Sequence, residues 1–260
     1  MPKSGKRRGR VHSRKPLVSI ITVCLNAEKT IARTIESVLR QTYSHIEYLI
    51  TDGASTDGTL DIVRRYQPRF KGRMRIHSER DLGIYDAMNK GIRLSRGAII
   101  GIINSDDWYE PDAVRLVVDS YRKHGDAVFY GILRVMEEGK EVMLRAVNPQ
   151  FLYRDVLGHP AYLVAKSIYD TWGAFRLDYR YASDYELMMR LIHCHAPFVQ
   201  IDAVLANFSQ GGESGQYGLK TLEEYLRVRY EYGYLTKRRM LVQISKYRTL
   251  FFLKKMRIHI

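Results

Sequence analysis

The chain has 260 residues, of which 45% are hydrophobic and 27% charged, and its formal net charge is +14. This length and apolar content suffice for a full hydrophobic core and exclude wholesale disorder. Its two cysteines, Cys24 and Cys194, lack CxxC spacing, so we expect neither a disulfide scaffold nor a cysteine-built zinc site. Because no long unbroken apolar run is present, no membrane-spanning helix is expected.

The positive charge is concentrated at the two ends of the sequence. Residues 1–15 contain seven Lys or Arg and no acid, and residues 225–260 contain ten Lys or Arg and one acid. The two ends together carry +16, so residues 16–224 carry −2. A nearly neutral body argues against nucleic-acid binding, and no nucleic acid is expected as a partner. The basic, tyrosine-containing segment 225–260 suits an anionic membrane surface, the alternative being a solvated helix face.

In chain order, strands and helices alternate over the first 120 residues. Apolar, β-branched runs predict strands at residues 17–24, 46–50, 74–78 and 98–103. Helical spacing of apolar residues predicts helices at 27–41, 56–66, 81–94 and 111–122. Pro111 suits the first turn of the last of these helices. The alternation predicts an α/β fold with a mainly parallel central sheet flanked by helices.

The second half of the chain has a mixed pattern. Residues 127–147 are strand-like with a turn at Glu138-Gly139, and residues 159–165 and 198–208 are further extended runs. Residues 184–193 have helical spacing, and the last forty residues are predicted to be helical.

Polar side chains follow three of the predicted parallel strands. Asn26 comes after the first strand, Asp52 after the second and Asp106 after the fourth. In open α/β sheets, ligands bind outside the carboxyl ends of the strands. The sequence therefore predicts a ligand site at this edge of the sheet.

The run Asn104-Ser105-Asp106-Asp107 directly follows an apolar strand. Mg²⁺ and Mn²⁺ accept a few carboxylates while keeping positions open for phosphate oxygens, so this run is a candidate metal site. The alternative is that Ser105, Asp106 or Asp107 caps the helix that begins near Pro111. The acids at the other strand ends favour a site.

Two further segments carry candidate ligand groups. In Thr51–Thr59, Asp52 can accept a hydrogen bond from an imide or a ribose hydroxyl, whereas Ser55 and Asp57 suit a structural turn and helix cap. In Glu79–Gly91, Asp81, Asp86 and Lys90 would line a helix beside the cleft, and Gly83 would permit close backbone approach. The alternative for Asp86 and Lys90 is an i, i+4 surface ion pair.

Residues 17–110 resemble the nucleotide-binding half of a family 2 glycosyltransferase with the GT-A fold. The resemblance rests on four blocks in the right order, Val18–Asn26, Asp52–Thr59, Asp81–Gly91 and Asn104–Asp107. Three later segments resemble the acceptor half of bacterial polysaccharide-type members: His159-Pro160, Ala182–Leu187 with Arg190, and Gly211–Ser214. This resemblance covers about residues 17–215 and implies a glycosyltransferase domain there, with halves 17–110 and 111–215. The charge and helical patterns predict a disordered basic tail at 1–16 and a basic, aromatic helical segment at 216–260.

This resemblance implies transfer of a sugar, with inversion, from a nucleotide diphosphate donor to a hydroxyl of a glycan or lipid-linked acceptor. A UDP-sugar is favoured by family frequency. The residues implied to contact the donor are Thr22, Asn26, Asp52, Asp81, Gly83, Lys90, Asn104 and Ser105. Asn104 and Asp106 occupy the family's Asp-X-Asp motif, with Asp106 as the main ligand of Mn²⁺ or Mg²⁺. Asn104 departs from the usual Asp, and we expect it to contact the ribose or bound water.

The resemblance also implies that Asp184 is the catalytic base, which takes the proton of the acceptor hydroxyl. The alternative is an N-cap of the helix 185–193. His159 is a candidate contact of the acceptor or the diphosphate. The implied location is the cytoplasm, at the inner face of the membrane. A nucleotidyltransferase remains an alternative of another class, although a Gly-rich, Lys/Arg-bearing loop is missing after the first strand.

Overall fold

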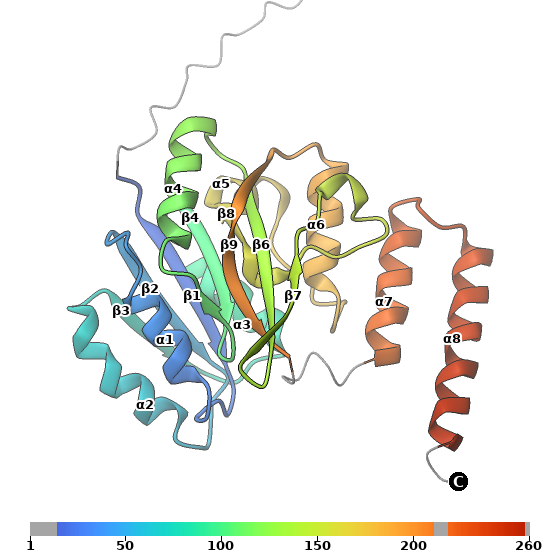
Figure 1. Ribbon diagram of the computed structural model, residues 1–260, viewed down its shortest axis with the longest axis horizontal. Coiled ribbons are helices and arrows are strands. Elements are labelled where there is room, and N and C mark those ends of the chain that lie inside the picture. The colour runs from blue at the N-terminus through green and yellow to red at the C-terminus, as the bar shows by residue number, and fades with distance from the viewer. Residues whose placement is uncertain (1–14, 211–217, 258–260) are drawn as a thin grey trace, which may run out of the picture.

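The computed structural model describes residues 15–210 and 218–257 (Figure 1). In this part of the chain, the strands form one sheet in the order β3-β2-β1-β4-β8-β6-β9-β5, with β7 paired to β6. The strands are β1 (Val18–Cys24), β2 (Ile46–Asp52), β3 (Met74–Ser78), β4 (Ile99–Asn104), β5 (Trp108–Tyr109), β6 (Val128–Glu137), β7 (Lys140–Arg145), β8 (Tyr162–Ala165) and β9 (Phe198–Ser209).

Helices cover both faces of this sheet. They are α1 (Ile31–Leu39), α2 (Thr59–Tyr66), α3 (Ile84–Leu94), α4 (Ala113–His124), α5 (Lys166–Trp172), α6 (Ser183–His193), α7 (Gly218–Glu231) and α8 (Lys237–Arg257). Short 3-10 helices lie at Gln67–Phe70, Pro149–Phe151 and His159–Ala161. Helices α1 and α4 lie on one face and α3 on the other, while α7 and α8 stand side by side at one end of the molecule (Figure 1).

The first four strands in chain order are parallel, as the sequence predicts. Every residue of β1 and β2 is buried, which explains their nearly continuous apolar character. The pairing register sets Cys24 beside Asp52 and Val23 beside Asn104. The carboxyl ends of β1, β2 and β4 therefore lie level with one another, and this brings their polar residues to one edge.

Helix α3 lies unusually close to β1 because of Gly91. A Cβ atom at this position would be 2.5 Å from Cγ2 of Ile21, a fully buried residue. Only glycine fits this contact without movement of the core. The close approach fixes where the first turn of α3 lies relative to the strand ends.

The acceptor half is built on mixed pairing. Strand β8 is antiparallel to both β4 and β6, and β6 is parallel to β9. The predicted hairpin with a turn at Glu138-Gly139 is confirmed as β6 and β7. Because the sheet continues across residue 110, the division of the domain at that point stays a prediction.

Several helix starts differ from the predicted ones. Helix α3 begins at Ile84 rather than 81, because Gly83 has φ +130° and cannot continue a helix. Pro111 precedes α4, whose N-cap is Asp112, so the capping alternative for Ser105, Asp106 and Asp107 is wrong. Helix α6 begins at Ser183 with Ala182 as its N-cap. Asp184 therefore lies in the first turn, and its interpretation as the N-cap is also wrong.

The C-terminal helices differ from each other in burial. Helix α7 buries Leu226 and Val228, whereas most side chains of α8 are exposed. No helix within the described ranges is both long and apolar enough to span a membrane. Residues 1–14 of the basic tail and the Gly211–Ser214 motif lie outside the described residues.

Candidate active site

Asp52 connects the ends of β2 and β3 at the predicted edge. Its carboxylate accepts hydrogen bonds from the Ser55 backbone N–H at 3.0 Å and from the Ser78 hydroxyl at 2.7 Å. The Ser55 hydroxyl also donates to it. Asp52 is only 1% exposed. The carboxylate therefore orders the loop after β2, and its contact with a nucleotide stays a prediction.

Asn26 holds the same loop from the end of β1. The residue is exposed and has φ +50°, and its side-chain oxygen accepts from the Thr56 N–H at 2.9 Å. Thr22 is fully buried, and its hydroxyl lies 2.9 Å from the Tyr48 hydroxyl. This geometry does not support the predicted contact between Thr22 and the nucleotide, because the side chain has no accessible surface.

Lys90 lies among three carboxylates. Its Nζ is 2.7 Å from Asp81, 2.8 Å from Glu79 and 3.3 Å from Asp86. Partial burial opposes the positive charge, but the hydrogen bonds that Lys90 donates to these carboxylates prevail and raise the pKa of Lys90. The predicted ion pair between Asp86 and Lys90 is present. A contact between Lys90 and a phosphate would have to replace one of these partners.

The loop before α3 brings Asp81 to the strand ends. A Cβ atom built on Gly53, just after β2, would be 3.0 Å from Asp81 Oδ2. Gly83 has open space where its side chain would be, and the neighbouring Leu82 is 89% exposed. Asp81 and Gly83 therefore flank an accessible surface beside Asn26 and Asp52.

The segment after β4 is held in place by hydrogen bonds from β9 and from α1. Asn104, Ser105 and Asp106 are half-buried, whereas Asp107 is fully buried and accepts from the Ser209 N–H at 3.0 Å. Burial raises the pKa of Asp107 well above its ordinary value.

Arg33 of α1 supports the same segment. Its guanidinium donates to the Asp106 carbonyl at 2.7 Å and lies 3.8 Å from the centre of a Trp108 ring. Sequence patterns did not predict Arg33, because it lies 73 residues from Asp106 on a separate helix.

The side-chain oxygens of residues 104–106 suit a divalent cation that takes its remaining ligands from the substrate. The side-chain oxygen of Asn104 is buried without a hydrogen-bond partner among the described residues. No group of three or more His, Cys, Asp or Glu able to hold a metal occurs within 15–210 or 218–257. A site with one carboxylate and one amide needs further ligands from the donor, as is usual for Mg²⁺ beside phosphates.

Asp184 meets the donor half through Tyr85. The Tyr85 hydroxyl, on the first turn of α3, donates to Asp184 Oδ1 at 2.9 Å. Burial raises the pKa of Asp184, although the hydrogen bond from Tyr85 works in the opposite direction. A carboxylate of raised pKa is a stronger base once ionised. Tyr85 lies within the Asp81–Gly91 block, yet its partnership with Asp184 was not predicted.

His159 is linked to Tyr85 through the ring of Phe175. The ring is 8% exposed, and its Nδ1 is 2.8 Å from the Tyr162 hydroxyl. Burial lowers the pKa of His159 to about 4, so the ring is neutral near pH 7. It packs edge-on to Phe175, which in turn stacks on Tyr85. The observed contacts of the ring are packing contacts, and a contact of His159 with the acceptor or the diphosphate stays a prediction.

Residues 19–182 match the model of the family described as "Glycosyl transferase family 2". The chain belongs to glycosyl transferase family 2. It is therefore a glycosyltransferase, and the resemblance inferred from the four sequence blocks is confirmed. The matched segment ends two residues before Asp184. The family supports neither the nucleotidyltransferase nor the nucleic-acid-binding alternative.

Curated relatives of similar sequence include a glycosyltransferase and a chondroitin synthase. A PGL/p-HBAD biosynthesis glycosyltransferase of Mycobacterium bovis is 29% identical over 209 residues, covering 76% of this chain and 78% of the relative. A chondroitin synthase of Escherichia coli is 32% identical over 207 residues, covering 77% of this chain but 30% of the relative.

Solved structures confirm the GT-A fold. S. aureus TarS 1-349 in complex with UDP has a TM-score of 0.67 and 18% identity, covering 83% of this chain and 64% of that one. The mannosyltransferase PcManGT from Pyrobaculum calidifontis, in complex with GDP-Man and Mn²⁺, has a TM-score of 0.67 and 15% identity, covering 84% of this chain and 64% of that one. The predicted fold class, an α/β sheet flanked by helices with a helical C-terminus, is thus correct.

Proposed function

We propose that this glycosyltransferase moves a sugar from a nucleotide diphosphate donor to a hydroxyl of a glycan or lipid-linked acceptor, with inversion at the anomeric carbon. A UDP-sugar is the donor that we favour. The hydrogen bond between Tyr85 and Asp184 carries the proposal, because it joins the donor-side motif to the candidate base. Similar proteins supply the donor class: TarS structures contain UDP or UDP-GlcNAc, and PcManGT contains GDP-Man.

In this reaction, Asp184 takes the proton of the acceptor hydroxyl while the acceptor oxygen forms its bond to the anomeric carbon. The bond from that carbon to the phosphate oxygen breaks, and its electron pair leaves with the nucleotide diphosphate. The raised pKa of Asp184 suits this role, because proton transfer to a very weak base contributes little.

Asp106, with the unpartnered amide oxygen of Asn104, would hold Mn²⁺ or Mg²⁺ together with the donor diphosphate. The bound ion would neutralise charge on the departing diphosphate. Asn26 and Asp81 would flank the nucleoside, Asp52 would order the loop beside it, and Ser105 and Gly83 would border the donor.

A donor panel with two variants tests this assignment. Thermal shift and calorimetry with UDP, GDP, UDP-GlcNAc and GDP-Man, each with and without Mn²⁺, identify the nucleotide. Asp106→Ala should abolish Mn²⁺-dependent binding. Asp184→Asn should retain donor binding but lose at least about 100-fold in nucleotide diphosphate release from the bound sugar donor. Unchanged Mn²⁺-dependent binding by Asp106→Ala would reject the metal site, and near-normal turnover by Asp184→Asn would reject the base.

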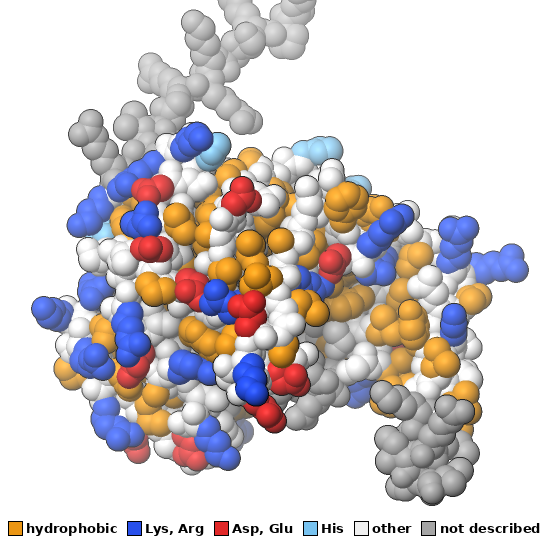
Figure 2. All heavy atoms as spheres, viewed as in Figure 1, with side chains coloured by type: hydrophobic (Ala, Val, Ile, Leu, Met, Phe, Trp, Pro, Cys, Tyr) orange, Lys and Arg blue, Asp and Glu red, His pale blue; other side chains and the backbone are white. Residues whose placement is uncertain are grey.

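We further propose that α8 binds an anionic membrane surface, where a lipid-linked acceptor would be found. Its exposed side chains combine large apolar residues, including Val242, Phe252 and Leu253, with Lys and Arg. Figure 2 shows hydrophobic and basic side chains interspersed over the lobe that α7 and α8 form. An interfacial helix uses this combination of apolar contact and attraction to anionic lipid.

A further inference from the structure

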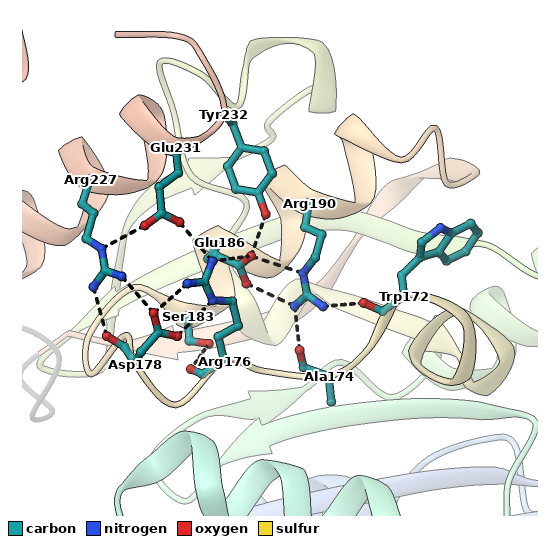
Figure 3. Close-up of polar contacts among 10 residues, drawn as sticks. All are labelled: Trp172, Ala174, Arg176, Asp178, Ser183, Glu186, Arg190, Arg227, Glu231 and Tyr232. Atoms are coloured by element: carbon teal, nitrogen blue, oxygen red, sulfur yellow. Dashed lines mark hydrogen bonds and ion pairs between the residues drawn. The ribbon is translucent and has the colours of Figure 1, made fainter. Parts of the chain in front are cut away.

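Helix α7 lies outside the segment that matches the family model, yet it is bound tightly to the acceptor half. Figure 3 shows Arg227 and Glu231 of α7 in ion pairs with Asp178 and Arg176. The Tyr232 hydroxyl, just after α7, donates to the fully buried Glu186 of α6 at 2.7 Å. Helix α7 is therefore part of the catalytic domain's structure, not a separate appendage.

One residue of α7 contacts the backbone just before the candidate base. The Glu224 carboxylate accepts three hydrogen bonds, from the N–H groups of Arg180 at 3.0 Å, Tyr181 at 2.7 Å and Ala182 at 2.9 Å. These donors lead directly into α6, whose first turn carries Asp184. Three bonds to one carboxylate restrain both the direction and the position of the chain at that point.

The local sequence does not provide this restraint. Ala182, the N-cap residue of α6, has no side-chain group that can accept a hydrogen bond, and helix starts usually rely on such a group. Glu224 supplies an acceptor from 42 residues away, and its negative charge is also favourable near the positive end of the helix dipole.

We propose that Glu224 is a positioning residue for Asp184: it fixes the entry into α6 and thereby holds the base against Tyr85. The neighbouring Tyr225 supports this arrangement. Its ring packs edge-on against the ring of Tyr185, the residue that follows Asp184, with the two ring centroids 4.9 Å apart. The proposal rests on the proposed function of Asp184. It adds a C-terminal helix, beyond the family segment, to the parts that determine turnover.

Hydrogen exchange tests the contact without any ligand. In the full-length chain, Glu224→Ala should raise the exchange rates of the amides of residues 180–182 by about tenfold, since three N–H groups lose their acceptor. Glu223→Gln is the matched control: Glu223 is adjacent on α7 but pairs with Arg248 of α8 at 2.7 Å. Unchanged exchange at 180–182 in Glu224→Ala would overturn the proposal.

Kinetics test the consequence for the base. With the sugar donor chosen by the panel above, Glu224→Ala should lower kcat for nucleotide diphosphate release by about tenfold while the donor KM stays within about twofold. Glu224→Asp retains the carboxylate and should recover part of kcat, and Glu223→Gln should match the parent enzyme.

Comparing Glu224→Ala with Asp184→Asn distinguishes a failure of the positioning role of Glu224 from a failure of Asp184 as the base. Normal kcat in Glu224→Ala with an inactive Asp184→Asn rejects the positioning role and leaves the base in place. Normal turnover in both variants rejects the base itself. A parallel loss of kcat, donor affinity and thermal midpoint in Glu224→Ala shows a merely structural role and also overturns the positioning proposal.

Discussion

At the scale of single residues, the contact between Tyr85 and Asp184 would determine how basic the proposed catalytic carboxylate is. Burial raises the pKa of Asp184, while the hydroxyl of Tyr85, 2.9 Å away, stabilises the ionised carboxylate and lowers the pKa. An isolated Asp has a pKa of about 3.9. We therefore expect the acid limb of kcat/KM to lie above that value, because activity is lost as pH falls through the pKa of the base.

Tyr85→Phe should move this acid limb further towards neutral pH. The variant removes the hydroxyl donor but keeps the ring, which stacks on Phe175 with centroids 5.4 Å apart. Without the donor the ionised carboxylate is less stable, so the pKa of Asp184 rises. At mildly acidic pH, kcat/KM then falls by about tenfold for each pH unit that the acid limb moves. The measurement is the pH profile of nucleotide diphosphate release from about pH 4 to about pH 8.5, a range that begins near the ordinary pKa of Asp, about 3.9.

Tyr66→Phe is the control for Tyr85→Phe. The Tyr66 hydroxyl donates to Glu36 at 2.8 Å, between α1 and α2 and away from Asp184. This variant should keep the parent pH profile. An acid limb that stays in place in Tyr85→Phe would mean that the hydroxyl does not control ionisation of the base.

At the scale of elements, the sequence predicted the parallel strands and their polar ends well. Buried parallel strands are apolar on both faces, and Asp52 and Asn104 end such runs, so local pattern was sufficient. Helix starts were predicted less well, because a single backbone angle decides them. The φ of +130° at Gly83 moves the start of α3 to Ile84.

The contacts between distant elements could not be predicted from local pattern. Tyr85 and Asp184 are 99 residues apart, and Glu224 bonds to residues more than 40 positions earlier. Hydrophobic periodicity shows which face of a helix is buried but not which helix it meets. Helix α5, Lys166–Trp172, was missed for a related reason, since it is too short for a clear periodic pattern.

Gly91→Ala should show how far the site depends on the close contact between α3 and β1. The new Cβ would lie 2.5 Å from Ile21 Cγ2 in a fully buried position. We expect a net loss of about 1–2 kcal/mol in the free energy of unfolding, because overpacking costs more than the helix propensity that alanine adds. Urea denaturation measures this change.

The matched control for Gly91→Ala is Gly218→Ala in α7. There the nearest atom to the new Cβ is Phe251 Cε2, at an ordinary 3.7 Å, so stability should be unchanged or slightly higher. Equal stability of Gly91→Ala and the parent protein would show that α3 can shift without cost.

At the scale of the whole molecule, α7 lies between the catalytic domain and α8. Adjacent residues of α7 face different partners: Glu223 pairs with Arg248 of α8, whereas Glu224 accepts from the backbone before α6. The sheet positions the donor half, and α7 holds the basic C-terminal helix on the side of the molecule where α6 lies (Figure 1). A membrane surface bound by α8 would therefore lie on the acceptor side of the enzyme.

The membrane proposal predicts that apolar residues of α8 are needed for vesicle binding. Phe252 and Leu253 are 63% and 52% exposed, and replacing both with Ser should lower partitioning onto phosphatidylcholine vesicles containing phosphatidylserine by about tenfold or more. Binding of the parent protein should also weaken as salt screens the Lys and Arg side chains. Co-sedimentation at two ionic strengths measures both effects.

The control is a pair of similarly exposed apolar residues in another element. Met143 and Leu144 of β7 are 56% and 53% exposed, and replacing both with Ser removes similar apolar surface without touching the basic helix. If any exposed apolar residues could bind the protein to vesicles by inserting into the lipid, both double variants would lose vesicle binding equally. We expect only the α8 variant to dissociate, because residues 237–257 contain eight Lys or Arg and no acid, whereas residues 140–145 contain two Lys or Arg and one Glu and attract anionic lipid less. Equal loss in both, or none in either, would contradict a role for α8.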